Sequence, residues 1–360
     1  MPWGGAAAAA VPTVAINASN ARMGGGLAYA EELVPRLEVE LRERGIESLV
    51  LSATGPLSAQ LSGVTQCRNV AAVFNVANVS LILARCPQLV AVRDRILVEP
   101  PGINPQLSTR RTEARRWALD AALRQSDIWA VPTQAMCQPL IAFANRHHIP
   151  VSPIEVIHHG APVDWRVEPM PARPPLRILN TSYGASQKNI PMLIRAVGRL
   201  PDELLASLTL TISPEEGEAR FGDCARRWAH GRVQFVGTIE RAQLPALYAA
   251  HHVVAFPSLV ESLGIPLLEG MASARIVVTV DKDWAREVCG PFATYARGDD
   301  PGSWAEAILA AASTTPPDQA PVASWLSAWT WAAAANRYAG ILAAMVGLSE
   351  PHPAPSPAPT

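Results

Sequence analysis

Glu261 and Glu269 are separated by seven residues and flank a segment whose main chain is suited to bind an anion. The apolar run 252–256 predicts a buried strand, and Pro266 favours the start of a helix because proline fits the first helical turn. Main-chain N–H groups at such a helix start attract a diphosphate. Carboxylates on either side of a diphosphate suit the hydroxyl groups of a nucleotide sugar. The alternative is an ordinary helix with acidic residues near its N-terminus.

Strands and helices alternate around this segment through the second half of the chain. The alternation predicts a doubly wound sheet with helices on both faces. Lys188 and Asn189 directly precede a helix expected from Ile190. The strands expected here are 176–181, 208–212, 233–236, 253–256, 276–280 and a short one at 293–296.

The first half of the chain has the same alternation and predicts a second parallel sheet. The chain is also expected to end on one long helix, 325–345, whose aromatic residues at helical spacing indicate packing between domains. The strands expected in the first half are 14–17, 48–51, 79–83, 95–98, 128–131 and 154–158, with helices at 27–44, 109–124 and 134–146.

The sequence from Pro257 to Gly290 resembles a known family. The pair Glu261 and Glu269, with Pro-Ser before it and Gly-Ile-Pro-Leu-Leu inside it, is similar to the signature of the retaining GT-B glycosyltransferases of family 4, the group 1 glycosyltransferases with a Glu-x7-Glu motif. The resemblance implies a GT-B fold, α/β, in which two Rossmann-like doubly wound domains face a central cleft. It also implies a C-terminal helix that packs back on the N-terminal domain.

The resemblance assigns roles to residues that match the family pattern. It implies that Glu269 binds the ribose hydroxyls, that Glu261 contacts the donor sugar, and that Lys188 neutralises charge on the leaving diphosphate. Glu261 and Lys188 are therefore the expected catalytic residues. The expected donor-binding residues are Glu269, Ser262, Leu263, Gly264, Ile265, Ser182, Gly25 and Gly26.

The glycines 24–26 follow the first expected strand, and the family resemblance puts such a loop across the cleft from the donor. A tight turn that needs positive φ is the alternative for any single glycine. An NAD-binding fingerprint is not satisfied, because Tyr29 stands where a third small residue belongs and the next strand, 48–51, has no acidic residue at its end.

Two positions depart from the family pattern. The family usually has an arginine about six residues before its lysine, and Ser182 and Tyr183 occupy that region here. Family members often carry a histidine after the strand expected to end at Val98, and this chain has Glu99. We expect Glu99 and His159 as acceptor-side candidates, although a histidine in the turn 158–164 is also typical of hydrogen-bonded structure.

Composition excludes several other classes of protein. The 360 residues suit two domains, and a net charge of −1 with 17% charged residues predicts no nucleic-acid partner. Five scattered cysteines have no metal-like spacing, no Asp-x-Asp clamp is present, and no metal or cofactor is expected. No apolar run reaches the ~18 residues of a membrane span, so a cytoplasmic protein is expected.

A basic cluster marks the helix expected at 109–124. Its members are Arg110, Arg111, Arg115 and Arg116. The cluster fits an anionic acceptor or weak peripheral contact with the inner face of a membrane, whereas a solvated helix face is the alternative.

Together with the family resemblance, these observations predict an enzyme of hexosyltransferase type. The resemblance implies transfer of a sugar from a UDP- or GDP-sugar to an acceptor hydroxyl with retention, and bacterial glycan or glycosylated-metabolite biosynthesis is the expected setting. A GT-B epimerase or phosphorylase and a catalytically weak nucleotide-sugar binding protein are the alternatives. The expected domains are an acceptor-side domain, 1–168, and a donor domain, 169–324, and the proline-rich stretch 169–175 is expected to link them. Residues 325–348 are expected to return to the first domain, and 349–360 to form a disordered tail.

Overall fold

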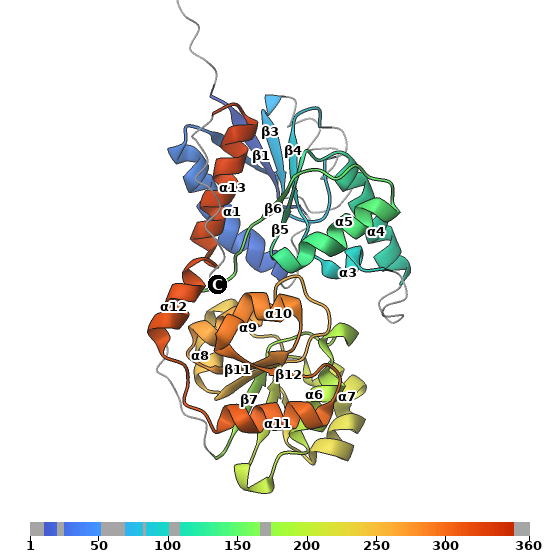
Figure 1. Cartoon of the computed structure of the whole chain (residues 1–360), viewed down its shortest axis with the longest axis vertical. Coiled ribbons are helices and arrows are strands. Elements are labelled where there is room, and N and C mark those ends of the chain that lie inside the picture. Colours follow the sequence, from blue (N-terminus) through green and yellow to red (C-terminus); the bar gives the residue numbers. More distant parts are fainter. Residues whose placement is uncertain are drawn as a thin grey trace, which may run out of the picture.

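The computed structural model describes residues 11–19, 25–51, 69–81, 84–100, 109–165 and 174–348, which form two lobes (Figure 1). Gly24, Pro101, Gly102, the tail 349–360 and most of the expected linker 169–175 lie outside these described residues. Each lobe has a sheet of six parallel strands with helices around it, so the predicted α/β class with two doubly wound sheets is confirmed.

The N-terminal sheet has the strand order β2-β1-β3-β4-β5-β6. Its strands are β1 (Thr13–Asn17), β2 (Glu47–Leu51), β3 (Ala72–Asn75), β4 (Gln88–Ala91), β5 (Ile128–Val131) and β6 (Ile154–Val156). Its helices are α1 (Gly25–Glu43), α3 (Arg95–Val98), α4 (Arg110–Arg124), the 3-10 turn η3 (Gln134–Met136) and α5 (Cys137–Arg146).

The C-terminal sheet has the order β12-β11-β10-β7-β8-β9. Its strands are β7 (Arg177–Asn180), β8 (Ser207–Leu210), β9 (Val233–Phe235), β10 (Val253–Phe256), β11 (Ile276–Val280) and β12 (Ala293–Ala296). The α-helices are α6 (Ile190–Val197), α7 (Pro214–Ala229), α8 (Leu244–Ala249), α9 (Ile265–Ala272), α10 (Asp283–Cys289) and α11 (Pro301–Ala312). The 3-10 turns are η4 (Ser186–Lys188), η5 (Asp202–Leu204), η6 (Arg241–Gln243) and η7 (Gly290–Phe292).

The chain reverses direction across each sheet at one point. In the C-terminal domain β7 leads to β8 and β9 on one side, and the chain then crosses to β10 on the other side of β7. Loops at the carboxyl ends of two strands that diverge in this way leave a crevice between them, which is the usual ligand site of such sheets. The switch point between β7 and β10 is therefore where the fold favours a ligand.

The last helix returns to the N-terminal domain, as the resemblance implied. The expected helix 325–345 is in fact two helices, α12 (Gln319–Ser327) and α13 (Trp331–Met345). They are separate because the Thr330 side chain accepts a hydrogen bond from the Ala333 N–H and caps the second helix. Helix α13 runs beside α1 in the upper lobe, and the Tyr338 hydroxyl meets the Tyr29 hydroxyl in the buried interface (Figure 1).

Two predicted strands of the first half were wrong. Residues 95–98 form α3 because Asp94 caps this short helix by accepting from the Ile96 N–H. Residues 79–81 are loop, and residues 82 and 83 lie outside the described part. The true strands, β3 and β4, carry the buried polar residues Asn75 and Gln88, which interrupt the apolar pattern that predicts a strand.

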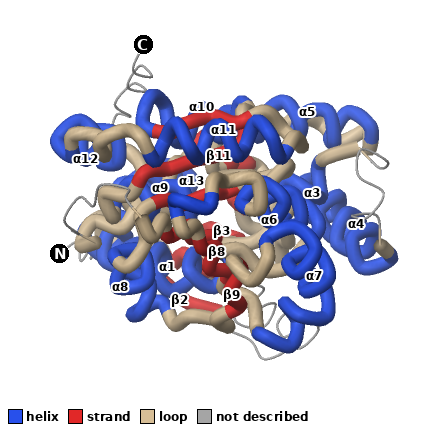
Figure 2. Tube along the Cα trace, turned by 90° about the horizontal axis from the view of Figure 1, so that it is seen from below, coloured by secondary structure: helices blue, strands red, loops and turns tan. Residues whose placement is uncertain are grey.

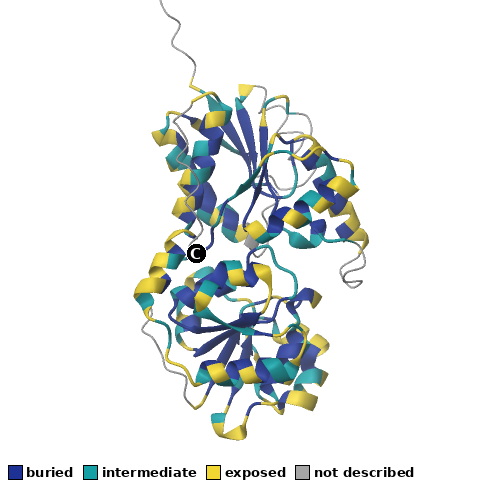
Figure 3. Ribbon diagram, in the orientation of Figure 1, coloured by how far each residue is buried: buried dark blue, intermediate teal, exposed yellow. Residues whose placement is uncertain are grey.

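Those buried polar side chains are satisfied by one another across the sheet. Asn17 donates to the Asn75 side chain at 2.9 Å, and Asn75 donates in turn to the Gln88 side chain at 3.0 Å. Buried amides that pair in this way avoid the cost of an unmade hydrogen bond. The strands of both sheets lie deep in their lobes, where most of their buried side chains are apolar (Figure 3).

The two domains are joined by polar contacts as well as by α12 and α13. Seen from below in Figure 2, helices lie around the strands of the two sheets. The Glu287 carboxylate of α10 accepts from the N–H groups of Gln134 and Ala135, at 2.5 and 2.8 Å, at the start of η3. His158 lies 3.3 Å from the same carboxylate and stacks on Trp329 with centroids 3.9 Å apart. Glu287 thus fixes one domain against the other at a helix N-terminus.

Close packing between α6 and α7 gives a stability prediction. A methyl group on Gly198 would lie 1.7 Å from the Trp228 carbonyl oxygen, whose main chain has little freedom to move. We expect Gly198→Ala to lower the free energy of unfolding by about 2 kcal/mol or more, measured by urea denaturation.

Gly340→Ala in α13 is the matched control. A methyl group at Gly340 meets no described atom within 4 Å beyond its own helix backbone, so alanine is expected to be neutral or to add about 0.5–1 kcal/mol. Equal stability changes in the two variants would contradict the described packing of α6 on α7.

Candidate active site

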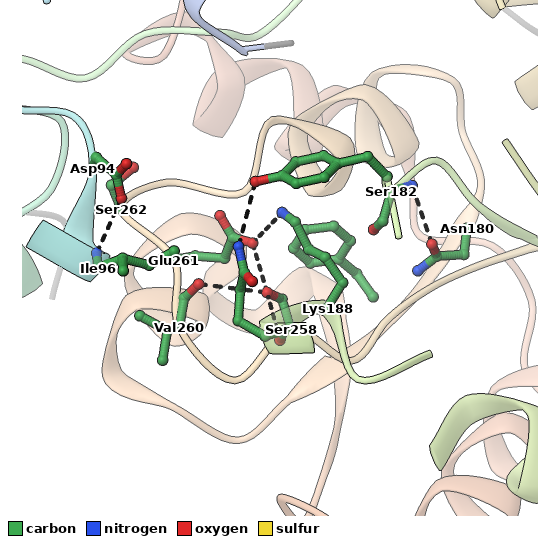
Figure 4. A network of polar contacts seen from close by, with 12 residues as sticks. Asp94, Ile96, Asn180, Ser182, Lys188, Ser258, Val260, Glu261 and Ser262 are labelled. Carbon is green, nitrogen blue, oxygen red and sulfur yellow. Dashed lines mark hydrogen bonds and ion pairs between the residues drawn. The ribbon is translucent and has the colours of Figure 1, made fainter. Parts of the chain in front are cut away.

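Lys188 and Glu261 form an ion pair at the switch point of the C-terminal sheet (Figure 4). Lys188 ends η4, after β7, and Glu261 lies in the loop between β10 and α9. The Lys188 Nζ donates to Glu261 Oε1, and Ser258 Oγ donates to the same oxygen at 2.6 Å. The two side chains are only 10% and 14% exposed. The pair thus lies in a poorly solvated place, where a charge interaction is stronger than in water.

Hydrogen bonds hold the two loops of this pair in register. The Gln187 carbonyl accepts from the Leu259 N–H at 2.8 Å and from Ser258 Oγ at 3.2 Å. Lys188 Nζ also lies 5.1 Å from the ring centroids of Tyr183 and Phe256, a distance at which an aromatic ring attracts a cation. The cation is therefore positioned by main chain, carboxylate and rings together.

Glu269 lies in the second turn of α9 and is 4% exposed. Its Oε2 accepts from the Tyr248 hydroxyl at 2.8 Å, and its Oε1 lies 3.8 Å from the Arg241 guanidinium. Burial raises the pKa of the Glu269 carboxyl, while the Tyr248 hydrogen bond and the Arg241 charge lower it. Tyr248 is held in turn by Thr181 at 3.0 Å.

Arg241 links this carboxylate to the other domain. Its Nε donates to Glu32 Oε1 of α1 at 2.7 Å, while its Nη1 faces Glu269. Arg36 binds the other oxygen of Glu32 at 2.8 Å and is more exposed. One guanidinium therefore lies between carboxylates of the two domains.

The start of α9 points toward the N-terminal domain. Gly264 has φ +86°, and a side chain there would lie 2.8 Å from the Trp284 ring, so glycine is required. Ser262 Oγ donates to the Arg93 carbonyl at 2.6 Å, and the Ser262 carbonyl accepts from Thr133 at 2.9 Å. Leu263 and Ile265 complete this start. Figure 4 shows Ser262 beside the Asp94 to Ile96 turn.

The other expected donor-side residues lie around this centre. Ser182 is buried after β7, and its N–H donates to Asn180 Oδ1 at 3.1 Å. Gly25 and Gly26 are the first residues of α1, on the N-terminal domain. Their contact with a donor stays a prediction.

Glu99 and His159 are not part of the Lys188 cluster. Glu99 follows α3 and pairs with Arg95 at 2.7 Å. His159 is buried against Tyr29 and Trp331, and its Nδ1 lies 3.0 Å from the Ile157 carbonyl. Burial lowers the pKa of His159 to about 3, so its ring is neutral.

Sequence analysis missed Arg93, Tyr248 and Arg241. Residues 95–98 form a helix and not a strand, so the strand that leads to the cleft here is β4. Arg93 is among the residues that directly follow β4. A strand assigned at 88–91 would have drawn attention to Arg93. Tyr248 and Arg241 meet Glu269 only through the tertiary fold.

The basic cluster on α4 is partly structural. Arg116 is buried and donates to the carbonyls of Ile96, Leu97 and Glu99. These hydrogen bonds satisfy carbonyl groups at the C-terminal end of α3. Arg115 pairs with Asp94 at 2.5 Å. Arg110 and Arg111 remain exposed, so a peripheral membrane contact through them stays a prediction.

The described residues hold neither a cluster of metal ligands nor a helix that could span a membrane. Over the ranges given above, no three or more His, Cys, Asp or Glu side chains are grouped so that they could hold a metal ion. Within the same ranges, every helix is too short or too polar to cross a bilayer.

Comparison with known proteins supports the resemblance. Residues 177–314 match the family described as "Glycosyl transferases group 1". The chain is 35% identical over 77 residues to the O-antigen chain mannosyltransferase RfbU of Salmonella typhimurium, covering 21% of this chain and 22% of that protein. It is 30% identical over 117 residues to the O-antigen chain mannosyltransferase B of Escherichia coli, covering 32% and 31%. The resemblance to group 1 glycosyltransferases is thus confirmed.

The matched segments span less than a third of these curated relatives. Among solved structures, HepE of Anabaena, crystallised with UDP and glucose, superposes with a TM-score of 0.70 over 92% of this chain and 100% of its own. At 15% identity this likeness shows the fold alone, and it confirms the expected GT-B fold.

The position of Arg241 gives a pH prediction. Burial raises the pKa of Glu269, so the folded state binds the proton more tightly and loses stability as pH rises from the unfolded pKa through the folded one. Arg241→Gln removes a charge that opposes this shift. We expect a loss on the order of 1 kcal/mol in unfolding free energy at pH 7.5 and a smaller loss at pH 5, from urea midpoints.

Arg36→Gln is the control, because Arg36 binds the same Glu32 but does not face Glu269. Its effect on stability is expected to be equal at both pH values. An Arg241→Gln effect that is also independent of pH would show that Glu269 does not depend on this guanidinium.

Proposed function

We propose that this chain, whose C-terminal domain matches the group 1 glycosyl transferases, transfers a sugar from a nucleotide-sugar donor to an acceptor hydroxyl. One observation carries the proposal. Lys188, Glu261 and Glu269 follow the two strands that diverge at the switch point, and all three lie within the segment that matches the family. Ligands of doubly wound sheets bind at this place.

The chemistry follows from the charges at this site. Lys188 and the main-chain N–H groups of Ser262 to Ile265 hold the diphosphate and stabilise negative charge as it leaves, since they are fixed before the reaction begins. Glu269 accepts hydrogen bonds from the ribose hydroxyls, with Tyr248 keeping its carboxylate in place. Glu261 uses Oε1 for Lys188 and Ser258, so we assign Oε2 to a hydroxyl of the donor sugar.

The donor and the linkage are finer parts of the proposal. The names of the curated relatives speak of mannose, whereas the HepE structures contain UDP or UDP-glucose, so GDP- and UDP-hexoses are the donors to test first. The acceptor is a glycan, a lipid-linked intermediate or a small molecule of a bacterial pathway. We propose retention of configuration, which the anomeric coupling in the NMR spectrum of the product tests.

We also propose that transfer needs no metal cofactor, because side chains and main-chain N–H groups of the protein, Lys188 and the helix start among them, stabilise the charge of the diphosphate. Turnover is then expected to be unchanged by EDTA. Restoration of lost activity by Mg²⁺ or Mn²⁺ after chelation would contradict this part of the proposal.

The donor site predicts selective stabilisation by one nucleotide. A ligand at ~100 times its dissociation constant adds about 2.7 kcal/mol to the folded state, which raises the melting temperature. In a thermal-shift panel of UDP, GDP, dTDP and ADP with their hexose conjugates, we expect one base to stabilise the wild type. Glu269→Gln is expected to lose most of this shift, because its amide cannot accept at both atoms.

Glu203→Gln, an exposed substitution in the same domain, serves as the control and should keep the shift. If none of the nucleotides raises the melting temperature of the wild type, the proposed donor site is wrong.

Lys188 gives a kinetic prediction. With the matching donor at saturation, Lys188→Gln should lower kcat by about 100-fold or more, because one preorganised charge at the leaving group is lost. The double variant Lys188→Gln with Glu261→Gln tests whether the loss comes only from an unpaired Glu261. We expect the double variant to remain inactive, and recovery of kcat in it would assign Lys188 a purely structural part.

A further inference from the structure

The negative charges of a bound diphosphate would exceed the positive charge that Lys188 supplies at this site. Lys188 is already paired with Glu261, and both side chains are nearly buried. A nucleoside diphosphate brings more than one negative charge to this place. A buried anion is costly unless opposite charges or hydrogen bonds compensate it. The loop after β7 has Ser182 and Tyr183, and neither supplies a positive charge.

Arg93 of the opposite domain lies directly at this site. Its carbonyl accepts from Ser262 Oγ at 2.6 Å, and Ser262 is the first residue of the anion-binding segment proposed above. Its N–H donates to Asn78 Oδ1 at 2.8 Å, which fixes the main chain beyond the end of β4. The Arg93 main chain is therefore held next to the start of α9.

The Arg93 side chain extends toward the other segment expected at the diphosphate. Its guanidinium stacks on the Tyr29 ring, with 4.1 Å from Cζ to the ring centroid. Tyr29 is one turn beyond Gly25 and Gly26 on α1, so the guanidinium lies against the first turns of α1 while the Arg93 carbonyl contacts the start of α9. Stacking uses the face of a guanidinium, and its N–H groups lie in the plane, where they match phosphate oxygens.

The surroundings of Arg93 favour an anionic ligand. Its side chain is half-buried, and burial lowers the pKa of the guanidinium, while the nearby hydroxyls of Tyr29 and Tyr338 and the Asp94 carboxylate raise it. Tyr29 itself is rigid, since it packs edge-on against His159 and Trp331 and meets Tyr338. A phosphate beside this cation would lower the cost of its desolvation.

We propose that Arg93 contacts the distal (β) phosphate of the nucleotide sugar, and thus supplies from the N-terminal domain a second positive charge for the leaving diphosphate. This inference rests on the proposed function. It makes the complete anion site depend on both domains, because Lys188 and the α9 start lie on one and Arg93 on the other. The positive charge acts on the diphosphate and not on the nucleoside.

The test compares nucleoside diphosphates with their monophosphates. Dissociation constants of UDP, UMP, GDP and GMP are measured by calorimetry for wild type and Arg93→Gln. For the base that binds, we expect Arg93→Gln to weaken diphosphate binding about tenfold or more and monophosphate binding about threefold or less, since a charge-assisted hydrogen bond is lost only at the β-phosphate. Arg124→Gln, on the same domain and paired with Asp120, removes one exposed charge as the control and should leave both constants unchanged.

The ratio of the two constants separates the outcomes. If Arg93→Gln weakens both ligands equally, Arg93 is structural and the inference fails while the donor site stands. If the wild type binds no nucleotide, the proposed function fails and the inference fails with it. Should Arg93→Gln not fold, Arg93→Lys keeps the charge without the planar fork, and a diphosphate-selective loss smaller than tenfold is expected, whereas an equal loss for both ligands overturns the inference.

Discussion

The ion pair between Lys188 and Glu261 is the interaction on which the site depends. It joins the loops after β7 and β10, the two strands between which the chain reverses direction. Both charges are nearly buried, so removal of either one leaves the other poorly solvated. The Gln187 carbonyl and Ser258 hold the loops in register around the pair. The parallel β7 and β10 therefore define the geometry of the candidate site.

The second constraint is the fixed relation of the two domains. Ser262 is held by Arg93 and Thr133, Glu287 accepts from the start of η3, and Arg241 joins Glu32 to Glu269. Helix α12 packs on α9 of the C-terminal domain, and α13 continues to the N-terminal domain, where it packs beside α1. The contacts of Ser262 and of Arg241 involve the proposed donor residues Ser262 and Glu269, whereas the Glu287 contact joins α10 to η3, which carry none. Movement of one domain against the other would therefore break contacts that Ser262 and Glu269 make.

The fold could be predicted wherever hydrophobic pattern and burial agree. All six strands of the C-terminal sheet were predicted, because β7, β10 and β11 are apolar runs between clear helix signals. The first half was harder. Asn75 and Gln88 are buried in strands because they satisfy one another, and no local pattern reveals such a pair. Asp94 makes residues 95–98 a helix by capping, a choice that the apolar run alone cannot indicate.

The sequence by itself determined the family resemblance, the two-sheet architecture and the residues Lys188, Glu261 and Glu269, because local motifs carry residue types and spacing. Their partners were decided by the tertiary structure. Tyr248 and Arg241 reach Glu269, and Arg93 reaches Ser262, from segments far away in the chain. The physical reason is that charge and hydrogen-bond partners act over a few ångströms of space, whatever their separation in sequence. Only the folded chain shows that His159 is buried and neutral and that Arg93 lies at the start of α9.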